Sequence, residues 1–198
     1  ASNDLDENTI LNLKMQKAKI DVWGVGTKLI TAYDQPALGA VYKIVSIEND
    51  QGVMHDTIKL SNNAEKVSTP GKKQVWRITS RAKGKSEGDY ITFADTDVNA
   101  LEEINMFHPT YTYINKTVRD FDAVPLLVPI YDKGQLIYDL PSIDEIKNYA
   151  TKELDGLWNE YKRVLNPQDY PVDLAKDVWD NKMTLIDNVR KKAHDLSE

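Results

Sequence analysis

The segment Gly24-Val25-Gly26-Thr27 contains residues that could bind an anion, and it directly follows an apolar run at residues 20–23. Glycine has no Cβ, so the backbone N–H groups of Gly24 and Gly26 can approach an oxyanion closely, and the Thr27 hydroxyl can donate a further hydrogen bond. Ligands of α/β folds collect at the carboxyl ends of strands, which is where these residues lie if residues 20–23 form a strand. A short glycine pattern is weak evidence, and it also fits a tight turn without a ligand.

The residues before this run are expected to place a carboxylate at the same edge. Ser2-Asn3-Asp4 resembles the end of a strand, and the following pattern predicts a helix that ends near Lys17, with Asp4 as N-cap and Glu7 completing a capping box. Strand end, helix and strand make most of one βαβ unit, whose parallel strands end at one rim. Asp4 could then accept hydrogen bonds from a diol while Gly26 and Thr27 hold an anion, and a sugar phosphate carries both groups. A purely structural role of Asp4 as a cap is the alternative, and the two roles can coexist.

The bulk composition excludes several classes of protein. The chain has 198 residues, of which 41% are hydrophobic, so it is long enough for one large globular domain or two small ones. A formal charge of −6 and the lack of a dense Lys/Arg block argue against nucleic-acid binding. No cysteine is present for a disulfide or a zinc site, and no apolar run approaches the roughly 20 residues of a membrane helix. These features fit a cytoplasmic protein. Because the chain starts without Met and without a signal peptide, we expect a carboxyl-terminal piece of a longer protein.

The middle of the chain predicts strands. β-branched and aromatic residues favour strands at residues 38–47, 53–60, 74–79 and 90–94, three or four of which are expected to form an antiparallel meander. A reverse turn is predicted at residues 49–52, a tight turn at Pro70-Gly71 and a flexible, charged connection at residues 82–89. Farther along, the patterns predict a short helix at 97–104, a strand at 111–118 and a hairpin formed by 126–131 and 135–138.

The last third of the chain predicts helices. Ser142 and Glu145 match a capping box after a proline, so a helix is expected to begin there and to run to about Leu165, where Asn166-Pro167 stops it. Pro171 precedes a last amphipathic helix.

Long stretches of the sequence resemble the nicotinate phosphoribosyltransferase family. They are SNDLDE (2–7), IDVWGVGTKLIT (20–31), QPALGAVYKIV (35–45), IKLSNNAEKVSTPGKKQVWRI (58–78) and a tail at 157–174 that is similar to the longer members. The resemblance implies the carboxyl-terminal part of an enzyme that couples nicotinate to phosphoribosyl pyrophosphate, giving nicotinate mononucleotide and pyrophosphate with ATP hydrolysis assisting. It implies a mixed α/β fold in three parts: a remnant of a type II phosphoribosyltransferase α/β barrel (1–45), a β-rich region (46–139) and a helical region (140–198).

Carried over by position, the resemblance puts Asn3 and Asp4 at the ribose and Gly24, Gly26 and Thr27 at the 5-phosphate. Lys28 could add positive charge there or face solvent. Lys72 and Lys73, in a polar stretch typical of the family, could reach a phosphate, but a hairpin turn explains their surroundings as well. The family's catalytic histidine and nicotinate-binding arginine have no equivalent, and His55, His108 and His194 are expected to be surface residues.

For the intact enzyme the resemblance implies ATP and Mg²⁺, the latter accompanying pyrophosphate rather than a dedicated protein site, and a homodimer with the active site at its interface. The isolated chain is expected to be inactive or nearly so. Two alternatives remain open at this stage. One is a non-catalytic structural or dimerisation module, and the other is a related enzyme that acts on nicotinamide or quinolinate.

Overall fold

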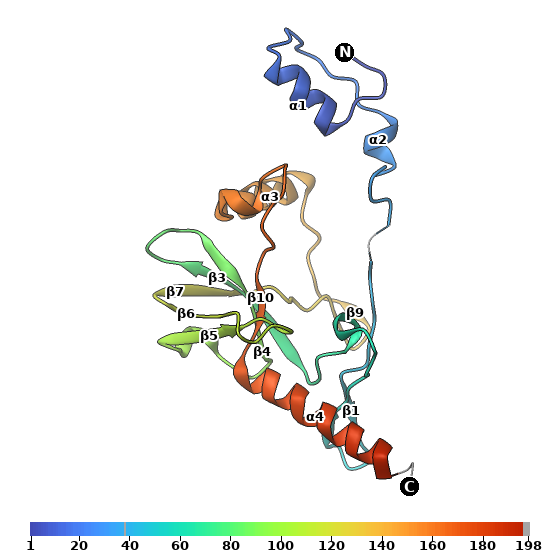
Figure 1. Cartoon of the computed structure of the whole chain (residues 1–198), viewed down its shortest axis with the longest axis vertical. Helices are drawn as coiled ribbons and strands as arrows, with labels where there is room; N and C mark the ends of the chain where they lie inside the picture. Colours follow the sequence, from blue (N-terminus) through green and yellow to red (C-terminus); the bar gives the residue numbers. More distant parts are fainter. Residues whose placement is uncertain (38, 196–198) are drawn as a thin grey trace. The chain divides into compact units, whose positions relative to one another are not determined.

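The computed structural model describes residues 1–37 and 39–195, which divide into two compact units, Ala1–Tyr42 and Lys43–Glu198. The strand predicted at residues 38–47 therefore begins outside the described residues. Figure 1 labels the helices and strands of both units.

The first unit contains helix α1 (Glu7–Met15) and the short helix α2 (Thr27–Ile30). Asp6, not Asp4, caps α1: its backbone is extended, and its Oδ1 accepts a hydrogen bond from the Thr9 N–H at 2.7 Å. Asp4 has φ of +49°, a left-handed conformation rather than the extended one typical of an N-cap residue. The predicted capping box of Asp4 and Glu7 is therefore wrong.

The segment predicted as a strand at residues 20–23 is extended but pairs at one point only. Ser2 and Gly24 form an isolated parallel bridge, supported by a hydrogen bond from the Gly24 N–H to the Ala1 carbonyl at 2.7 Å. A strand needs a partner along its whole length. Within the described part of this unit, only Ala1 and Ser2 pair with the segment at residues 20–24. The strand prediction is wrong in its extent, and the predicted parallel direction is confirmed at the bridge.

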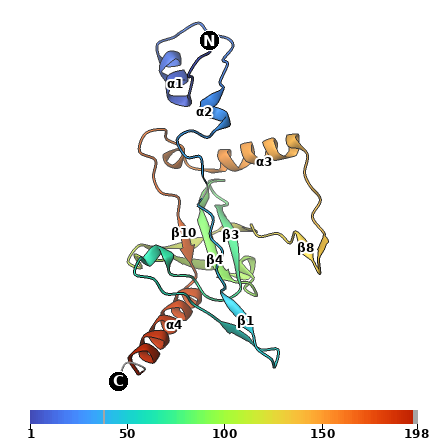
Figure 2. The same ribbon diagram turned by 90° about the vertical axis from the view of Figure 1, so that its right-hand side faces the viewer.

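The second unit is built on a six-stranded mixed sheet with the order β6-β5-β10-β4-β3-β7 (Figures 1 and 2). Most neighbouring strands are antiparallel, whereas β10 runs parallel to β4. The strands are β3 (Lys73–Ser80), β4 (Ser86–Phe93), β5 (Glu103–Phe107), β6 (Asn115–Arg119), β7 (Phe121–Pro125) and β10 (Val172–Leu174). The two long central strands β3 and β4 confirm the strands predicted at 74–79 and 90–94.

Three sequence predictions within this sheet are wrong. The second half of the flexible connection predicted at 82–89 is strand, because β4 begins at Ser86 and pairs with β3. The helix predicted at 97–104 is reduced to a single 3₁₀ turn, η2 (Val98–Ala100), and the residues after it pair with β6 as β5. The predicted simple meander is interrupted, because β10 from the last third of the chain is inserted between β4 and β5.

The hydrophobic core lies where the sheet meets helix α4 (Lys176–Asp195), which contacts β4 and β5. Figure 2 shows α4 leaving the sheet directly from the end of β10. The buried apolar residues come from all six strands, from η2 and from the start of α4: Trp76, Ile78, Tyr90, Val98, Ile104, Met106, Val118, Phe121, Ala123, Leu174, Ala175 and Val178. The buried Trp76 indole donates to the Thr92 hydroxyl at 3.0 Å, which satisfies the one polar group of that side chain.

Two hairpins lie outside the main sheet. β1 (Ser46–Glu48) pairs with β2 (Met54–Asp56) across the predicted turn at 49–52, and β8 (Tyr131–Asp132) pairs with β9 (Gln135–Leu136) in the hairpin predicted near Gly134. Both turns are confirmed, and the β8–β9 hairpin has shorter strands than predicted. The strand predicted at 38–47 is largely wrong, since β1 overlaps it only at Ser46 and Ile47 and residues 39–45 are not strand. The turn at Pro70-Gly71 is also confirmed. Gly71 has φ of +86°, and a Cβ there would come 2.6 Å from the Phe93 ring, so only glycine fits.

Helix α3 (Ile143–Gly156) begins with the predicted capping box: Ser142 accepts from the Glu145 N–H, and Glu145 accepts from the Ser142 N–H. It ends at Gly156 rather than near Leu165, since Leu157 and Trp158 have extended backbones before a 3₁₀ turn, η3 (Asn159–Tyr161). A further 3₁₀ turn, η1, covers Ala64–Lys66. The helix predicted directly after Pro171 starts only at Lys176, because the residues between them pair in the sheet as β10.

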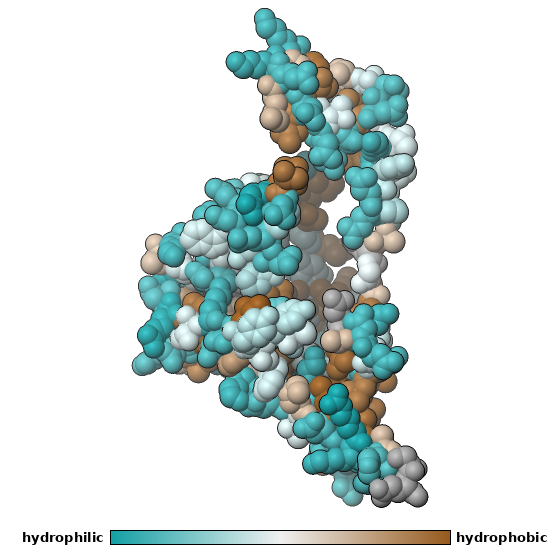
Figure 3. Space-filling model, viewed as in Figure 1, coloured by the Kyte–Doolittle hydropathy of each residue, from teal (hydrophilic) through white to brown (hydrophobic). Residues whose placement is uncertain are grey.

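The surface combines hydrophilic and hydrophobic residues, and both kinds are visible in Figure 3. Large apolar side chains exposed on α3 include Ile143, Ile146, Tyr149 and Leu154, and within the described residues this helix buries none of its side chains. Among the helices that the structure describes, none is long and apolar enough to cross a membrane.

Candidate functional site

The bridge between Ser2 and Gly24 brings together the two segments that carry the predicted site residues. Asn3 and Asp4 follow Ser2, and Gly26 and Thr27 follow Gly24. Because the pairing is parallel, both segments leave the bridge in the same direction. Gly24 is itself tightly placed, since a Cβ on it would come 3.1 Å from the Ser2 Cβ. The small size of Gly24 thus permits the close approach of the two backbones.

Asn3 and Asp4 turn the chain away from the bridge. Both have left-handed backbones, with φ of +85° and +49°, a conformation that Asn and Asp adopt more readily than most residues. Both are exposed, and within residues 1–37 and 39–195 their side chains make no hydrogen bond. Their polar atoms are therefore accessible to a ligand.

Gly26 and Thr27 form the start of α2. The Gly26 carbonyl accepts hydrogen bonds from the N–H groups of Leu29 and Ile30, both at 3.1 Å, and a Cβ on Gly26 would meet no atom within 4 Å. The Thr27 carbonyl accepts from the Thr31 hydroxyl, whereas the Thr27 hydroxyl has no hydrogen-bond partner among the described residues. The space beside Gly26 and the hydroxyl of Thr27 are thus both open.

Lys28 is held by the cap of α1. Its Nζ donates to Asp6 Oδ2 at 2.6 Å, and it lies 5.6 Å from the centre of the Tyr33 ring. This hydrogen bond lowers the pKa of Asp6 well below its ordinary value and raises the pKa of Lys28. The sequence suggested that Lys28 either contacts a phosphate or faces solvent. Neither describes it fully, because its ammonium binds Asp6 and so joins α2 to the start of α1.

A cavity of about 500 Å³ lies beside this ion pair within the first unit. Asp6, Lys28 and Tyr33 contribute to its lining, together with apolar residues of α1 and α2. Of the five predicted site residues, none is among those that line it. The predicted site is therefore an open edge next to the bridge rather than this cavity.

The other residues that were considered from the sequence have defined structural roles. Lys73 donates to the carbonyls of Thr69, at 2.7 Å, and of Pro70 and Gly71, so its ammonium closes the turn rather than facing a phosphate. Burial lowers the pKa of Lys73. His55 is exposed and contacts the Asn49 side chain at 2.9 Å, and His194 is exposed as well. His108 is partly buried and lines a cavity, so its surface assignment is only partly correct.

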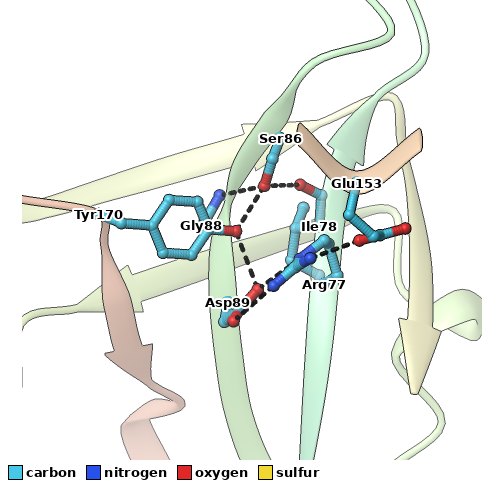
Figure 4. A network of polar contacts seen from close by, with 7 residues as sticks. All are labelled: Arg77, Ile78, Ser86, Gly88, Asp89, Glu153 and Tyr170. Carbon is cyan, nitrogen blue, oxygen red and sulfur yellow. Dashed lines mark hydrogen bonds and ion pairs between the residues drawn. The ribbon is translucent and has the colours of Figure 1, made fainter. Parts of the chain in front are cut away.

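A polar network that the sequence did not predict lies on the sheet and is shown in Figure 4. Arg77 in β3 and Asp89 in β4 are directly opposed cross-strand partners. Arg77 Nε donates to Asp89 Oδ1 at 3.0 Å and Nη2 to Oδ2 at 3.2 Å, while Nη1 donates to Glu153 of α3. The Tyr170 hydroxyl donates to Asp89 Oδ1 at 2.9 Å and lies 2.6 Å from the Ser86 hydroxyl.

This network connects distant parts of the chain. The Trp158 indole adds a hydrogen bond to the Ser86 carbonyl at 2.9 Å, so β3, β4, α3 and the residues on either side of η3 are linked. Burial raises the pKa of Tyr170 to about 12, which keeps its hydroxyl protonated and able to donate. The charged groups of Arg77 and Asp89 are satisfied by each other and by their neighbours, so the network is suited to holding the fold. Opposite charges at matching positions of two hairpin strands were the sequence signal that could have revealed it.

No three His, Asp or Glu side chains in the described part of the chain are grouped closely enough to hold a metal ion.

Comparison with known proteins places this arrangement in a family. Residues 72–182, which include most of the sheet and the polar network, match the model of the nicotinate phosphoribosyltransferase C-terminal domain. The chain is 55% identical to nicotinate phosphoribosyltransferase of Bacillus subtilis over 198 residues, which are 100% of this chain and 40% of that protein. It is 31% identical to the human protein of the same name over 176 residues, covering 88% of this chain and 31% of that protein.

A solved structure has the same fold. It is the crystal structure of human nicotinic acid phosphoribosyltransferase, with a TM-score of 0.69 and 24% sequence identity over 93% of this chain and 32% of that one. The mixed α/β class expected from the sequence is confirmed by this likeness. The chain spans about 40% of the length of its Bacillus subtilis relative. On the match of the family model to more than half of its residues, the chain belongs to the nicotinate phosphoribosyltransferase family.

Proposed function

We propose that this chain supplies the ribose-phosphate-binding edge of an enzyme that transfers the phosphoribosyl group of phosphoribosyl pyrophosphate to nicotinate. The products are nicotinate mononucleotide and pyrophosphate, and ATP hydrolysis assists the reaction. The observation that carries the proposal is the parallel bridge between Ser2 and Gly24, which holds two polar chain ends side by side. Relatives that bear the name of this enzyme support it.

In the proposed site, the carboxylate of Asp4 and the amide of Asn3 contact the ribose hydroxyls. The backbone at Gly26 and the hydroxyl of Thr27 contact the 5-phosphate, whereas Gly24 holds the bridge, because its N–H already donates to the Ala1 carbonyl. The exposed, unpartnered side chains of Asn3, Asp4 and Thr27 and the open space beside Gly26 support these assignments. Lys28 adds positive charge one residue away, although its ammonium is bound to Asp6.

The chemistry of such an enzyme is a displacement at the anomeric carbon of the ribose. The nicotinate nitrogen forms a bond to this carbon as the bond to pyrophosphate breaks, and positive charge develops on the sugar. A group that fixes the ribose and its 5-phosphate in one orientation lowers the entropic part of the barrier. This holding function is what we assign to the present chain.

The proposal extends to the intact enzyme. There we expect the first residues to belong to a type II phosphoribosyltransferase barrel and the active site to lie at the interface of a homodimer. Mg²⁺ is expected to arrive with pyrophosphate, whose oxygen atoms are its preferred kind of ligand. No residue of this chain is assigned to Mg²⁺ or to ATP. Because the assigned residues only hold the sugar phosphate, the chain on its own is expected to bind phosphoribosyl pyrophosphate with little turnover.

The test is a comparison of two variants with a matched control. Gly26→Val adds atoms in a space that is empty in the structure, so it clashes with no neighbouring group, and phosphate binding is expected to weaken. Asp4→Asn removes the charge of a side chain that does not cap α1, so its effect reports on the ribose contact. Asp50→Asn changes an exposed turn residue of the other unit and is the control.

Binding of phosphoribosyl pyrophosphate is measured by calorimetry on the chain, and KM is measured in an intact enzyme that contains it. Gly26→Val and Asp4→Asn are each expected to weaken binding by about tenfold or more, the effect of losing one good polar contact. Asp50→Asn is expected to leave it unchanged. Unchanged binding in both Gly26→Val and Asp4→Asn would overturn the assignment.

A further inference from the structure

A second cavity of about 580 Å³ lies in the unit that contains the sheet. One wall comes from the loop between β5 and β6, with His108, Tyr111 and Ile114, and the other from residues 169–173 that lead into β10. Tyr111 and Ile114 are exposed, and with Pro171 and Val172 they give the cavity flat and apolar walls. The predicted site residues all belong to the other unit.

Asp173 contributes a buried carboxylate to this cavity. Its residue is only 6% exposed, yet in the described part of the chain the carboxylate accepts no hydrogen bond and has no cation within 4.0 Å. Burial raises the pKa of Asp173, and the nearby His108 and Lys116 act in the opposite direction. No buried side-chain oxygen in the described residues lacks a hydrogen-bond partner, so the unpaired oxygens of Asp173 are open to solvent and can be reached by a ligand in the cavity.

His108 contributes a donor to the same cavity. Its Nδ1 accepts hydrogen bonds from the N–H groups of Thr110 at 3.1 Å and Tyr111 at 2.9 Å. A ring nitrogen that accepts carries no proton, so the proton of the neutral imidazole is on Nε2. The imidazole is stacked at a tilt against Tyr111, with ring centres 5.0 Å apart. The position of the ring is thereby fixed by its own loop.

The other polar groups of the cavity are already engaged or exposed. Lys116 Nζ binds the Glu87 carboxylate at 3.1 Å and the Glu87 carbonyl, and the Tyr170 hydroxyl belongs to the network of Arg77 and Asp89. Asp169 is exposed. Among the described lining residues that are not exposed, the polar groups without a protein partner are the Asp173 carboxylate and the His108 Nε2–H, and Tyr111 adds an aromatic surface.

We propose that this cavity binds a planar heteroaromatic ligand that carries an amino group next to a ring nitrogen. The amino group donates to the Asp173 carboxylate, the ring nitrogen accepts from His108 Nε2–H, and the ring lies against Tyr111 and Pro171. A cavity of this volume, with apolar walls and few polar groups, is typical of small-molecule sites. Asp173 and His108 both line the cavity and form no ion pair with each other, so both groups are available to one ligand.

The experiment uses the intact chain and two fragments of equal size, 4-aminopyrimidine and 4-methylpyrimidine, at slightly alkaline pH where the amine is uncharged. Their binding is measured by ligand-observed NMR and by the shifts of protein resonances. 4-Aminopyrimidine is expected to bind with a Kd of about 1 mM, ordinary for so few atoms, and the methyl analogue about tenfold more weakly. Ligand-induced shifts are expected at Tyr111 and Asp173.

A variant separates the carboxylate from the rest of the cavity. Asp173→Val keeps a side chain suited to strand β10 but removes the acceptor, so it is expected to abolish the preference for the amine. Asp132→Asn, in the exposed β8–β9 hairpin, is the matched control and is expected to bind both fragments as the native chain does. Equal binding of the two fragments by the native chain, or absence of binding, would overturn the proposal, and this comparison does not depend on the folding of any variant.

Discussion

Gly88 in β4 lies directly against Pro171, the residue before β10. A Cβ built on Gly88 would come 2.9 Å from the Pro171 carbonyl oxygen and 3.0 Å from its Cβ. The same carbonyl accepts a hydrogen bond from the Asp89 N–H at 2.9 Å, and Gly88 has φ of +133°. Glycine is therefore required here both by the backbone conformation and by the approach of β10 to β4.

Gly88→Ala is expected to destabilise the chain by about 2–4 kcal/mol, because it combines backbone strain with crowding of Pro171. Gly84→Ala is the matched control: Gly84 has φ of +61°, but a Cβ there would meet no atom within 4 Å. The control should cost about 1–2 kcal/mol from the backbone alone. Urea unfolding measures both. Equal losses in the two variants would mean that the contact with Pro171 is unimportant.

Arg77→Met is expected to cost about 2–3 kcal/mol, because it leaves the buried Asp89 carboxylate without its guanidinium partner, while Tyr170 still donates to it. Adding Asp89→Leu should recover part of this loss, since the unpaired charge is then gone. Arg119→Met, which breaks the exposed pair with Glu103, is the control and should change stability by no more than about 0.5 kcal/mol. A loss in Arg77→Met no larger than in the control would contradict the structural role of the network.

The local features of the fold could be predicted from the sequence, because they depend on neighbouring residues. The capping box at Ser142 and the turn at Pro70-Gly71 are of this kind. The choice between Asp4 and Asp6 as the cap of α1 was not accessible, since both are good capping residues and the backbone decides between them. Gly156 is a typical helix end, and α3 does end there. The apolar periodicity of the residues after Gly156 nevertheless favoured a longer helix in the prediction.

The long-range features could not be predicted. Strand β10 has three residues and pairs with β4, which is about eighty positions earlier, so no local pattern identifies it. Its insertion also determines where α4 begins and how the cavity beside Asp173 is closed. For the proposed ribose-phosphate site, the parallel direction of the two segments followed from the strand–helix–strand pattern. The sequence pattern did not predict the left-handed turn at Asn3 and Asp4 or the ion pair between Lys28 and Asp6.

The pH dependence of stability should reveal the buried carboxylate of Asp173. Its pKa in the folded chain is raised above the ordinary 3.8 because of burial, so the folded state binds the proton more tightly than the unfolded state does. Its contribution to stability is therefore greatest at acidic pH and is lost as the pH rises through the raised pKa. Asp173→Asn should be more stable than the native chain at neutral pH and should lose this advantage below pH 3.8. A constant difference across the pH range would show that Asp173 does not titrate in this way.

The cap of α1 provides a test in the first unit. Asp6→Ala should accelerate hydrogen exchange of the Thr9 amide, because that N–H loses its acceptor, and should free Lys28. Asp6→Asn, which keeps a capping oxygen but not the charge, should affect Thr9 less. Asp4→Ala is the matched control and should leave the exchange of Thr9 unchanged. Since the pKa of Asp6 is lowered by Lys28, its stabilising effect is fully present above the ordinary value of 3.8 and is lost as the pH falls through the lower folded-state pKa. Faster exchange of Thr9 in Asp4→Ala than in Asp6→Ala would return the cap to Asp4, and Asp4 could then no longer be assigned to the ribose on the strength of its free side chain.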